Sequence, residues 1–165
     1  MQGLDLAQFK ALLVRPVLAQ IGLAGAAAVP LVTGTALVES GLVWLRQNGG
    51  GPALGLWQME PATHDDCWRN FLAFRPALAA AVRRVGGVDA GVGSAGLLVG
   101  NLAYACAMAR VVYARAPSPL PAGTDSVGLS AYHKQFYNTL LGAADSQRTA
   151  ALFAQAIAAC CPPPM

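Results

Sequence analysis

Two short segments, Thr35 to Gly41 (TALVESG) and Gly55 to Pro61 (GLWQMEP), carry most of the information about how this chain folds. The first places the carboxyl group of Glu39 at the end of an apolar run, two residues before a glycine of the kind that commonly ends a helix. The second combines glycine, an aromatic residue and an amide. Between them, the run Asn48 to Pro52 (NGGGP) excludes a helix. Together they predict a helix that delivers an acid, a loop, and a turn that faces the acid.

The composition predicts an all-α protein with a single domain over residues 1–165. Hydrophobic residues make up 55% of the 165 residues and charged residues 12%, and alanine is far more frequent than any β-branched or aromatic residue. A chain of this length buries roughly two thirds of its unfolded surface. Helices are expected at about 4–20 with a kink at Pro16, 26–40, 60–74, 76–84, 94–115, 125–141 and 144–160. A short β-hairpin or extended turn is expected near 50–60, a buried central helix at 94–115, and a disordered tail at 161–165.

Glu39 shares a helical face with Val32, Thr35 and Ala36, at spacings of seven, four and three residues. This wall is small and mostly apolar, so we expect a partly desolvated acid. Desolvation favours the protonated form of a carboxyl group, which can then act as a general acid near neutral pH. No other carboxylate in the sequence has a comparable setting.

The Glu39-Ser40 pair followed by Gly55 to Gln58 (GLWQ) resembles the signature of the soluble lytic transglycosylases and goose-type lysozymes, a branch of the lysozyme-like superfamily. In that family a catalytic Glu-Ser pair ends a helix, and a Gly-Leu-Met-Gln turn follows at a comparable distance. The segment 101–109 (NLAYACAMA) resembles the buried Asn-bearing helix of the family, and 129–132 (LSAY) resembles its Ala-Tyr-Asn segment.

The sequence departs from the family pattern in three places. Trp57 stands where methionine is usual, His133 stands where asparagine follows the tyrosine, and the glycine that typically follows that asparagine is missing. The segments 51–66 and 132–139 also look like those of bacteriophage proteins described as lysozyme-like or transglycosylase-like. The resemblance therefore implies a phage-encoded, lysozyme-like domain used in cell lysis or wall penetration.

What the resemblance implies is cleavage of the β-1,4 bond between N-acetylmuramic acid and N-acetylglucosamine in peptidoglycan. Glu39 would protonate the glycosidic oxygen and then take the proton of the muramic O6 hydroxyl, leaving a 1,6-anhydro ring. A hydrolytic muramidase of the inverting type would instead need a second carboxylate about 6.5–9.5 Å away. The sequence offers Glu60, Asp65 and Asp66 for that role. A third hypothesis is an inactive glycan-binding or virion structural protein.

Further residues are candidates for substrate binding, and each also has a structural explanation. Trp57 is either a core aromatic residue or a platform for a sugar face, Ser40 either ends its helix or orients Glu39, and Asn101 in a charge-free helix needs hydrogen bonds in any case. The candidates for substrate binding are Ser40, Trp57, Gln58, Asn101, Tyr132 and Tyr137.

We expect no metal and no cofactor. The run His64 to Cys67 contains ligand-type residues, but consecutive residues on a helix point in different directions. The four cysteines lack a metal-ligand spacing and are expected to be reduced thiols. The net charge of +3 is scattered along the chain, which argues against nucleic acid as a partner and leaves peptidoglycan glycan strands.

A membrane span is not expected. Residues 16–38 carry no charge, but proline, glycine, glutamine and threonine interrupt them, which favours buried helices. The start of the sequence lacks the features of an ordinary signal peptide. We therefore expect synthesis in the bacterial cytoplasm and action on the periplasmic cell wall, after release, from a virion, or after export by residues 16–38. The sequence does not indicate an oligomeric state.

Overall fold

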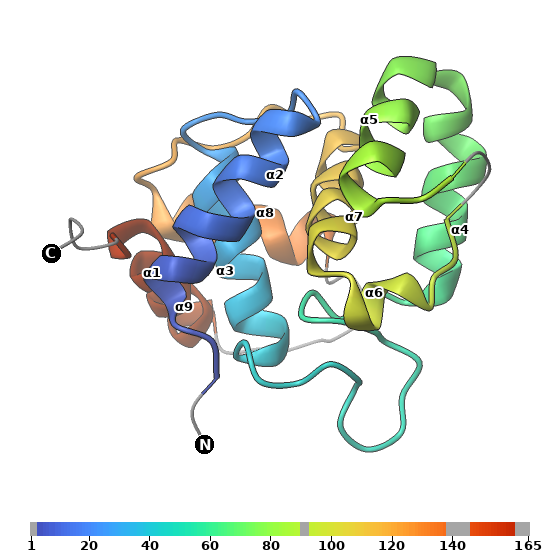
Figure 1. Cartoon of the computed structure of the whole chain (residues 1–165). Helices are drawn as coiled ribbons and strands as arrows, with labels where there is room; N and C mark the ends of the chain where they lie inside the picture. The colour runs from blue at the N-terminus through green and yellow to red at the C-terminus, as the bar shows by residue number, and fades with distance from the viewer. Residues whose placement is uncertain (1–2, 90–92, 138–145, 161–165) are drawn as a thin grey trace, which may run out of the picture.

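The structure is a computed structural model that describes residues 3–89, 93–137 and 146–160. Most of these residues are helical, which confirms the expected all-α class. The helical elements are α1 (Leu6–Gln8), η1 (Phe9–Val14), α2 (Arg15–Gln20), α3 (Ala28–Ser40), α4 (Pro61–Asn70), η2 (Leu72–Phe74), α5 (Pro76–Gly86), α6 (Leu97–Gly100), α7 (Leu102–Ala114), α8 (Ser126–Phe136) and α9 (Ser146–Ala158). Figure 1 shows α1, α2, α3, α8 and α9 on one side of α7, with α4 and α5 on the other.

The first helix is continuous but changes its winding before Pro16. Residues Phe9–Val14 form a π-helix, and the amide of Arg15 donates to the carbonyl of Lys10, five residues back. Pro16 stands directly after this wider turn, at the start of α2, and its ring nitrogen has no N–H to donate to the preceding turn. The helix expected at 4–20 is therefore present, and the irregularity expected at Pro16 takes the form of a wider turn ahead of it.

The helix that carries Glu39 is buried along most of its length. Residues 28–36 of α3 are all buried, and the helix ends where expected, because Gly41 adopts the left-handed conformation with φ 60°. It packs against α9, η1, α7, α8 and α2. Gly34 permits the close approach of α9, since a Cβ atom at this position would lie 2.3 Å from Cδ1 of Phe153.

The central helix is interrupted, which corrects the expectation of one helix over 94–115. Asn101 has φ −107° and ψ 89° and separates α6 from α7. Its side-chain oxygen accepts from the amide of Tyr104 at 3.0 Å and so caps α7. Residues 104–113 of α7 are all buried, so α7 is the central helix of the core.

The loop from Gly41 to Glu60 contains the expected extended turn. Isolated antiparallel bridges join Arg46 to Leu54 and Leu54 to Met59. Gly55 has φ 74°, and a Cβ atom there would lie 2.1 Å from the carbonyl oxygen of Leu98. The turn therefore presses against α6. In Figure 1 this loop extends below the helices.

Hydrogen bonds from Lys10 connect the first helix to the end of α9. Lys10 is 7% exposed, and its ammonium group donates to the carbonyls of Ala156, Ile157 and Ala159 at 2.7, 2.9 and 3.0 Å. Burial lowers the pKa of Lys10 below its ordinary value. Since the last carbonyls of a helix have no partner within the helix, Lys10 acts as a C-terminal cap for α9.

Several expectations concern the C-terminal part of the chain and the cysteines. Residues 138–141 of the helix expected at 125–141, which include Asn138, and the tail 161–165 lie outside the described residues. Cys67, Cys106 and Cys160 are free thiols, as expected. Within the described ranges, no helix is both long and apolar enough to cross a bilayer.

The contact between Gly34 and Phe153 predicts a stability change. Gly34→Ala adds a methyl group where ring atoms already lie, and the overpacking outweighs the roughly 1 kcal/mol gained from the better helix propensity of alanine. We expect the free energy of unfolding to fall by about 1–2 kcal/mol in urea denaturation. Gly100→Ala, where a Cβ meets nothing within 4 Å, serves as the control and should not destabilise the protein. A Gly34→Ala variant as stable as the wild type would contradict the proposed close approach.

The cap at the end of α9 predicts a second stability change. Lys10→Met keeps an unbranched stem but removes the donor to three carbonyls, so the free energy of unfolding should fall by about 2–3 kcal/mol. Lys134→Met, on an exposed position of α8, is the matched control and should change it by less than about 0.5 kcal/mol. Equal losses in the two variants would show that the cap contributes nothing.

Candidate active site

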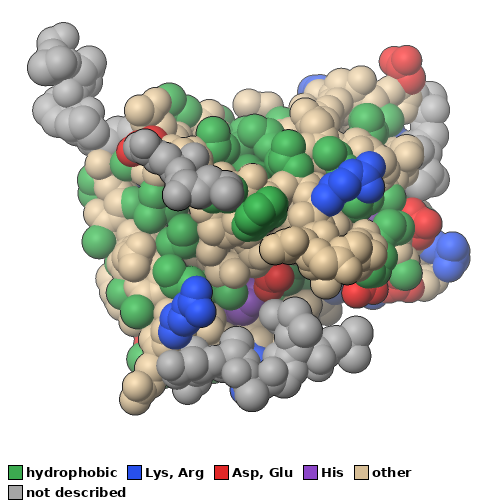
Figure 2. Space-filling view, turned by 90° about the horizontal axis from the view of Figure 1, so that it is seen from below, with side chains coloured by type: hydrophobic (Ala, Val, Ile, Leu, Met, Phe, Trp, Pro, Cys, Tyr) green, Lys and Arg blue, Asp and Glu red, His purple; other side chains and the backbone are tan. Residues whose placement is uncertain are grey.

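Glu39 lies in the last turn of α3 with its side chain 11% exposed. The three residues expected to form its wall, Val32, Thr35 and Ala36, are each fully buried. The carboxyl group is therefore partly desolvated yet reachable from solvent, as the sequence indicated. Figure 2 views the molecule from below and shows an acidic side chain against a histidine in a hollow of this face.

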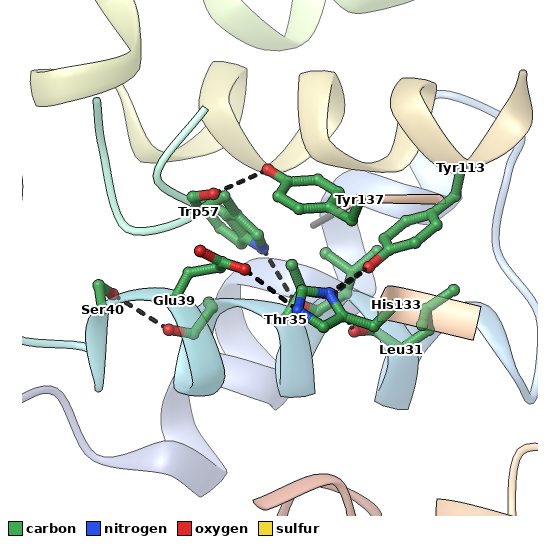
Figure 3. Close-up of polar contacts among 10 residues, drawn as sticks. Leu31, Thr35, Glu39, Ser40, Trp57, Tyr113, His133 and Tyr137 are labelled. Carbon is green, nitrogen blue, oxygen red and sulfur yellow. Dashed lines mark hydrogen bonds and ion pairs between the residues drawn. The ribbon is translucent and has the colours of Figure 1, made fainter. Parts of the chain in front are cut away.

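Among the described residues, His133 of α8 lies against the Glu39 carboxyl group. The Oε1 atom of Glu39 lies 3.1 Å from Nε2 of His133, whose side chain is 2% exposed. This distance allows an ion pair, although the angle at Nε2 does not meet the geometry of a hydrogen bond. Figure 3 shows the two side chains pointing toward each other from α3 and α8.

A chain of hydrogen bonds continues behind the histidine. The Nδ1 atom of His133 lies 3.0 Å from the Tyr113 hydroxyl, which lies 2.6 Å from the Thr35 hydroxyl. Thr35 in turn donates to the carbonyl of Leu31 at 2.8 Å. Burial raises the pKa of Tyr113 well above its ordinary value. The phenol therefore stays neutral and keeps its proton for donation (Figure 3).

Tyr137 joins the turn to this network. Its ring stacks on His133 at 5.6 Å between centroids, and its hydroxyl donates to the carbonyl of Trp57 at 2.8 Å. Burial, together with the nearby Glu39 carboxylate, raises the pKa of Tyr137 well above its ordinary value. Of the two tyrosines considered for substrate binding, Tyr137 thus lies beside the acid site and supports the ring of its histidine.

Trp57 is a core residue, which decides between the two explanations that the sequence left open. Its side chain is 1% exposed, and the indole N–H donates to the carbonyl of Val32 at 2.9 Å. A ring this deeply buried presents no face to a sugar. Its indole instead fastens the turn to α3, because a buried N–H group requires an acceptor.

Ser40 and Gln58 stabilise the backbone at the two ends of the loop. The Ser40 hydroxyl donates to the carbonyl of Ala36 at 3.1 Å and accepts from the amide of Leu42 at 3.2 Å, which is the helix-ending role considered for it. Gln58 has φ 45°, and its amide donates back to the carbonyl of Gly55 at 2.8 Å. Both side chains therefore shape the path between the acid and the turn.

Asn101 and Tyr132 have structural roles. Asn101 caps α7 and also donates to the carbonyl of Gly86 at 2.7 Å. The Tyr132 hydroxyl donates to the carbonyl of Ser118 at 2.8 Å, and its ring packs on Phe136 at 4.6 Å. Tyr132 thus holds the 117–121 connector against α8, next to the helical turn that carries His133.

The three possible second carboxylates belong to α4 or its start. Glu60 is exposed immediately before α4. Asp65 lies 2.8 Å from Nδ1 of His64, and Asp66 pairs with Arg115 and accepts from Asn70. Hydrogen bonds from Asn70 and then from Arg115 lower the pKa of Asp66 below its ordinary value. Asp65 and Asp66 are therefore already engaged in local contacts.

His64 forms a separate buried network. Its Nε2 atom lies 2.7 Å from the Tyr104 hydroxyl, which also accepts from the Trp68 indole at 2.8 Å. Burial is the main cause that raises the pKa of Tyr104 to about 12. Both nitrogens of His64 are engaged, which agrees with a structural role for the 64–67 run.

One residue beside the acid, His133, is not among the candidates from sequence. The sequence marks it only as a departure from the family pattern, although its spacing of four from Tyr137 places both on one helix face. His133 could not be assigned to the site without knowing which helices meet there.

Comparison with known proteins identifies no relative of this chain. No protein-family model, curated protein or solved structure matches the chain. The family resemblance stated above therefore depends on the sequence motifs alone.

The burial of Trp57 predicts the behaviour of the three tryptophans toward a soluble quencher. Trp57 and Trp68 are 1% and 3% exposed and Trp44 is 44% exposed. In iodide quenching of intrinsic fluorescence, Trp44→Phe should remove most of the quenchable emission, whereas Trp57→Phe should leave it. If Trp57→Phe abolished the quenchable emission instead, the indole would be exposed and available to a sugar.

Proposed function

We propose that this protein is a peptidoglycan lytic transglycosylase in which Glu39 serves as both acid and base. The observation that carries the proposal is the placement of a partly buried carboxyl group at the end of α3, opposite His133 and still 11% exposed to solvent. A general acid needs a desolvated setting together with access to substrate, and Glu39 has both. The lysozyme-like Glu-Ser and Gly-Leu-x-Gln motifs support the same reading.

The proposed reaction consumes no water. Glu39 gives its proton to the oxygen that links the two sugars, and the bond between that oxygen and C1 of N-acetylmuramic acid breaks. The resulting carboxylate takes the proton of the muramic O6 hydroxyl as O6 bonds to C1. The acid is regenerated, and the new chain end is a 1,6-anhydro ring.

Two of the three other candidate carboxylates, Asp65 and Asp66, are engaged in local contacts, which favours this reaction over hydrolysis. An inverting hydrolase needs a second carboxylate that is free to activate a water. Asp66 is paired with Arg115 and Asn70, and Asp65 with His64. A single-carboxylate mechanism requires neither of them. We further propose that the substrate is the glycan strand of the periplasmic wall and that the chain is encoded by a phage.

The test is mass spectrometry of purified cell wall digested in water enriched in ¹⁸O. Wild-type protein should release muropeptides that are one water lighter than hydrolysis products and carry no ¹⁸O. Glu39→Gln should reduce the rate by at least roughly 100-fold, the contribution expected of a general acid. Glu60→Gln is the matched control on an exposed carboxyl and should digest the wall at the wild-type rate.

Other outcomes would identify the rival functions. Reducing ends that contain ¹⁸O would identify a hydrolytic muramidase, and loss of activity in Glu60→Gln, Asp65→Asn or Asp66→Asn would identify its second carboxylate. If wild type and a folded Glu39→Gln variant bind the wall but release nothing, the chain is a glycan-binding or structural protein.

A further inference from the structure

The surroundings of the His133 ring differ from those of an ordinary core histidine. From each element packed on it, the ring meets one defined group: Glu39 from α3, Tyr113 from α7, and Phe153 from α9, with Tyr137 stacked on its face. Of these, the groups that titrate are the Glu39 carboxyl and the two phenols. Because burial keeps both phenols neutral, the charge state of this pocket is decided by Glu39 and His133.

The hydrogen bonds behind the ring fix the position of one proton. A backbone carbonyl can only accept, so the 2.8 Å contact between Thr35 and Leu31 uses the threonine hydroxyl proton. The 2.6 Å contact between Tyr113 and Thr35 must then use the proton of the phenol. No proton of Tyr113 remains for the 3.0 Å contact with His133, so Nδ1 of His133 must donate it.

This assignment determines what Nε2 presents to Glu39. With the Nδ1 proton committed to Tyr113, a neutral ring has only a lone pair at Nε2. A lone pair facing a carboxylate oxygen at 3.1 Å would be repulsive. The contact is therefore favourable when the pair carries one further proton, either on a neutral Glu39 carboxyl group or on a cationic ring, and it is electrostatic because the angle at Nε2 does not fit a hydrogen bond.

We infer that His133 is a positioning residue for Glu39, with the Thr35 and Tyr113 hydroxyls holding its proton on Nδ1 so that the pair formed by Nε2 and the Glu39 carboxyl group retains one further proton. The retained proton is the one that a general acid must keep ready for the glycosidic oxygen. The catalytic consequence rests on the proposed function, whereas the proton assignment stands on geometry alone.

The proton assignment can be measured without any activity. The chain contains two histidines, so long-range ¹H–¹⁵N correlation of protein labelled at histidine gives two imidazole patterns, and His133→Gln identifies one of them. We expect Nδ1 of His133 to carry a proton in the wild type and in Glu39→Gln. Tyr113→Phe and Thr35→Val should release this preference, so that the proton exchanges between Nδ1 and Nε2. Lys134→Gln, an exposed neighbour on α8, should leave the pattern unchanged.

An unprotonated Nδ1 in the wild type overturns the inference, whether or not the protein cleaves cell wall. It would mean that Nε2–H donates to Glu39 and that Tyr113 donates to the ring. The tautomer is measured in the folded protein, so the wild-type spectrum alone decides the result. A variant that fails to fold does not affect it.

The positioning role predicts a particular kinetic pattern in the digestion assay. His133→Gln and Tyr113→Phe should lower kcat, by up to roughly 100-fold for the histidine, and leave KM near the wild-type value. Tyr113→Phe should be the milder change, because it removes only the group that fixes the tautomer. A rise in KM at unchanged kcat would show that His133 binds substrate and would overturn the positioning role. A wild type with no cleavage activity would refute the proposed function, and the spectrum would still decide the proton assignment.

Discussion

The candidate site depends on the packing of α9 against both α3 and α8. Phe153, fully buried on α9, contacts α3 at Gly34 and lies 5.7 Å from the ring of His133. One aromatic ring therefore touches the helix that carries the acid and the helix that carries its histidine partner. Because interiors are close-packed, a shift of this ring would move the two helices relative to each other. The glycine at position 34 is what allows the approach.

Helix α3 also organises the polar contacts of the core. Its backbone carbonyls accept from the Thr35 hydroxyl and from the Trp57 indole, and its end is closed by the Ser40 hydroxyl. Polar groups buried in this way need partners; Thr35 and Ser40 bond to carbonyls of their own helix, and the Trp57 indole holds the turn against α3. The acid at its last turn is thus placed by a helix that is held from several sides, which suits a group that must meet substrate in a defined position.

The sequence predicted those features that local chemistry decides. The left-handed end of α3 follows from a glycine after an apolar run, and the desolvated wall of Glu39 follows from helical spacing alone. The break at Asn101 was missed because its charge-free surroundings read as one continuous helix, and only the capping contact shows the interruption. Trp57 could not be assigned because its large apolar body and its N–H donor fit a core and a groove equally well. The pairing of Glu39 with His133 joins positions 94 residues apart, since 133 − 39 = 94, so no local pattern reveals it.

The cap that Lys10 forms on α9 bears on when, during synthesis, the pocket around Glu39 can form. Glu39 belongs to the early part of the chain, whereas α9, which packs against His133, is the last helix described. The C-terminal end of α9 is held by Lys10 from the first helix. A nascent chain that has emerged only as far as α8 has both members of the pair but lacks the surface that brings them together. The acid therefore acquires its partner late in synthesis, once the two ends of the fold have closed on each other.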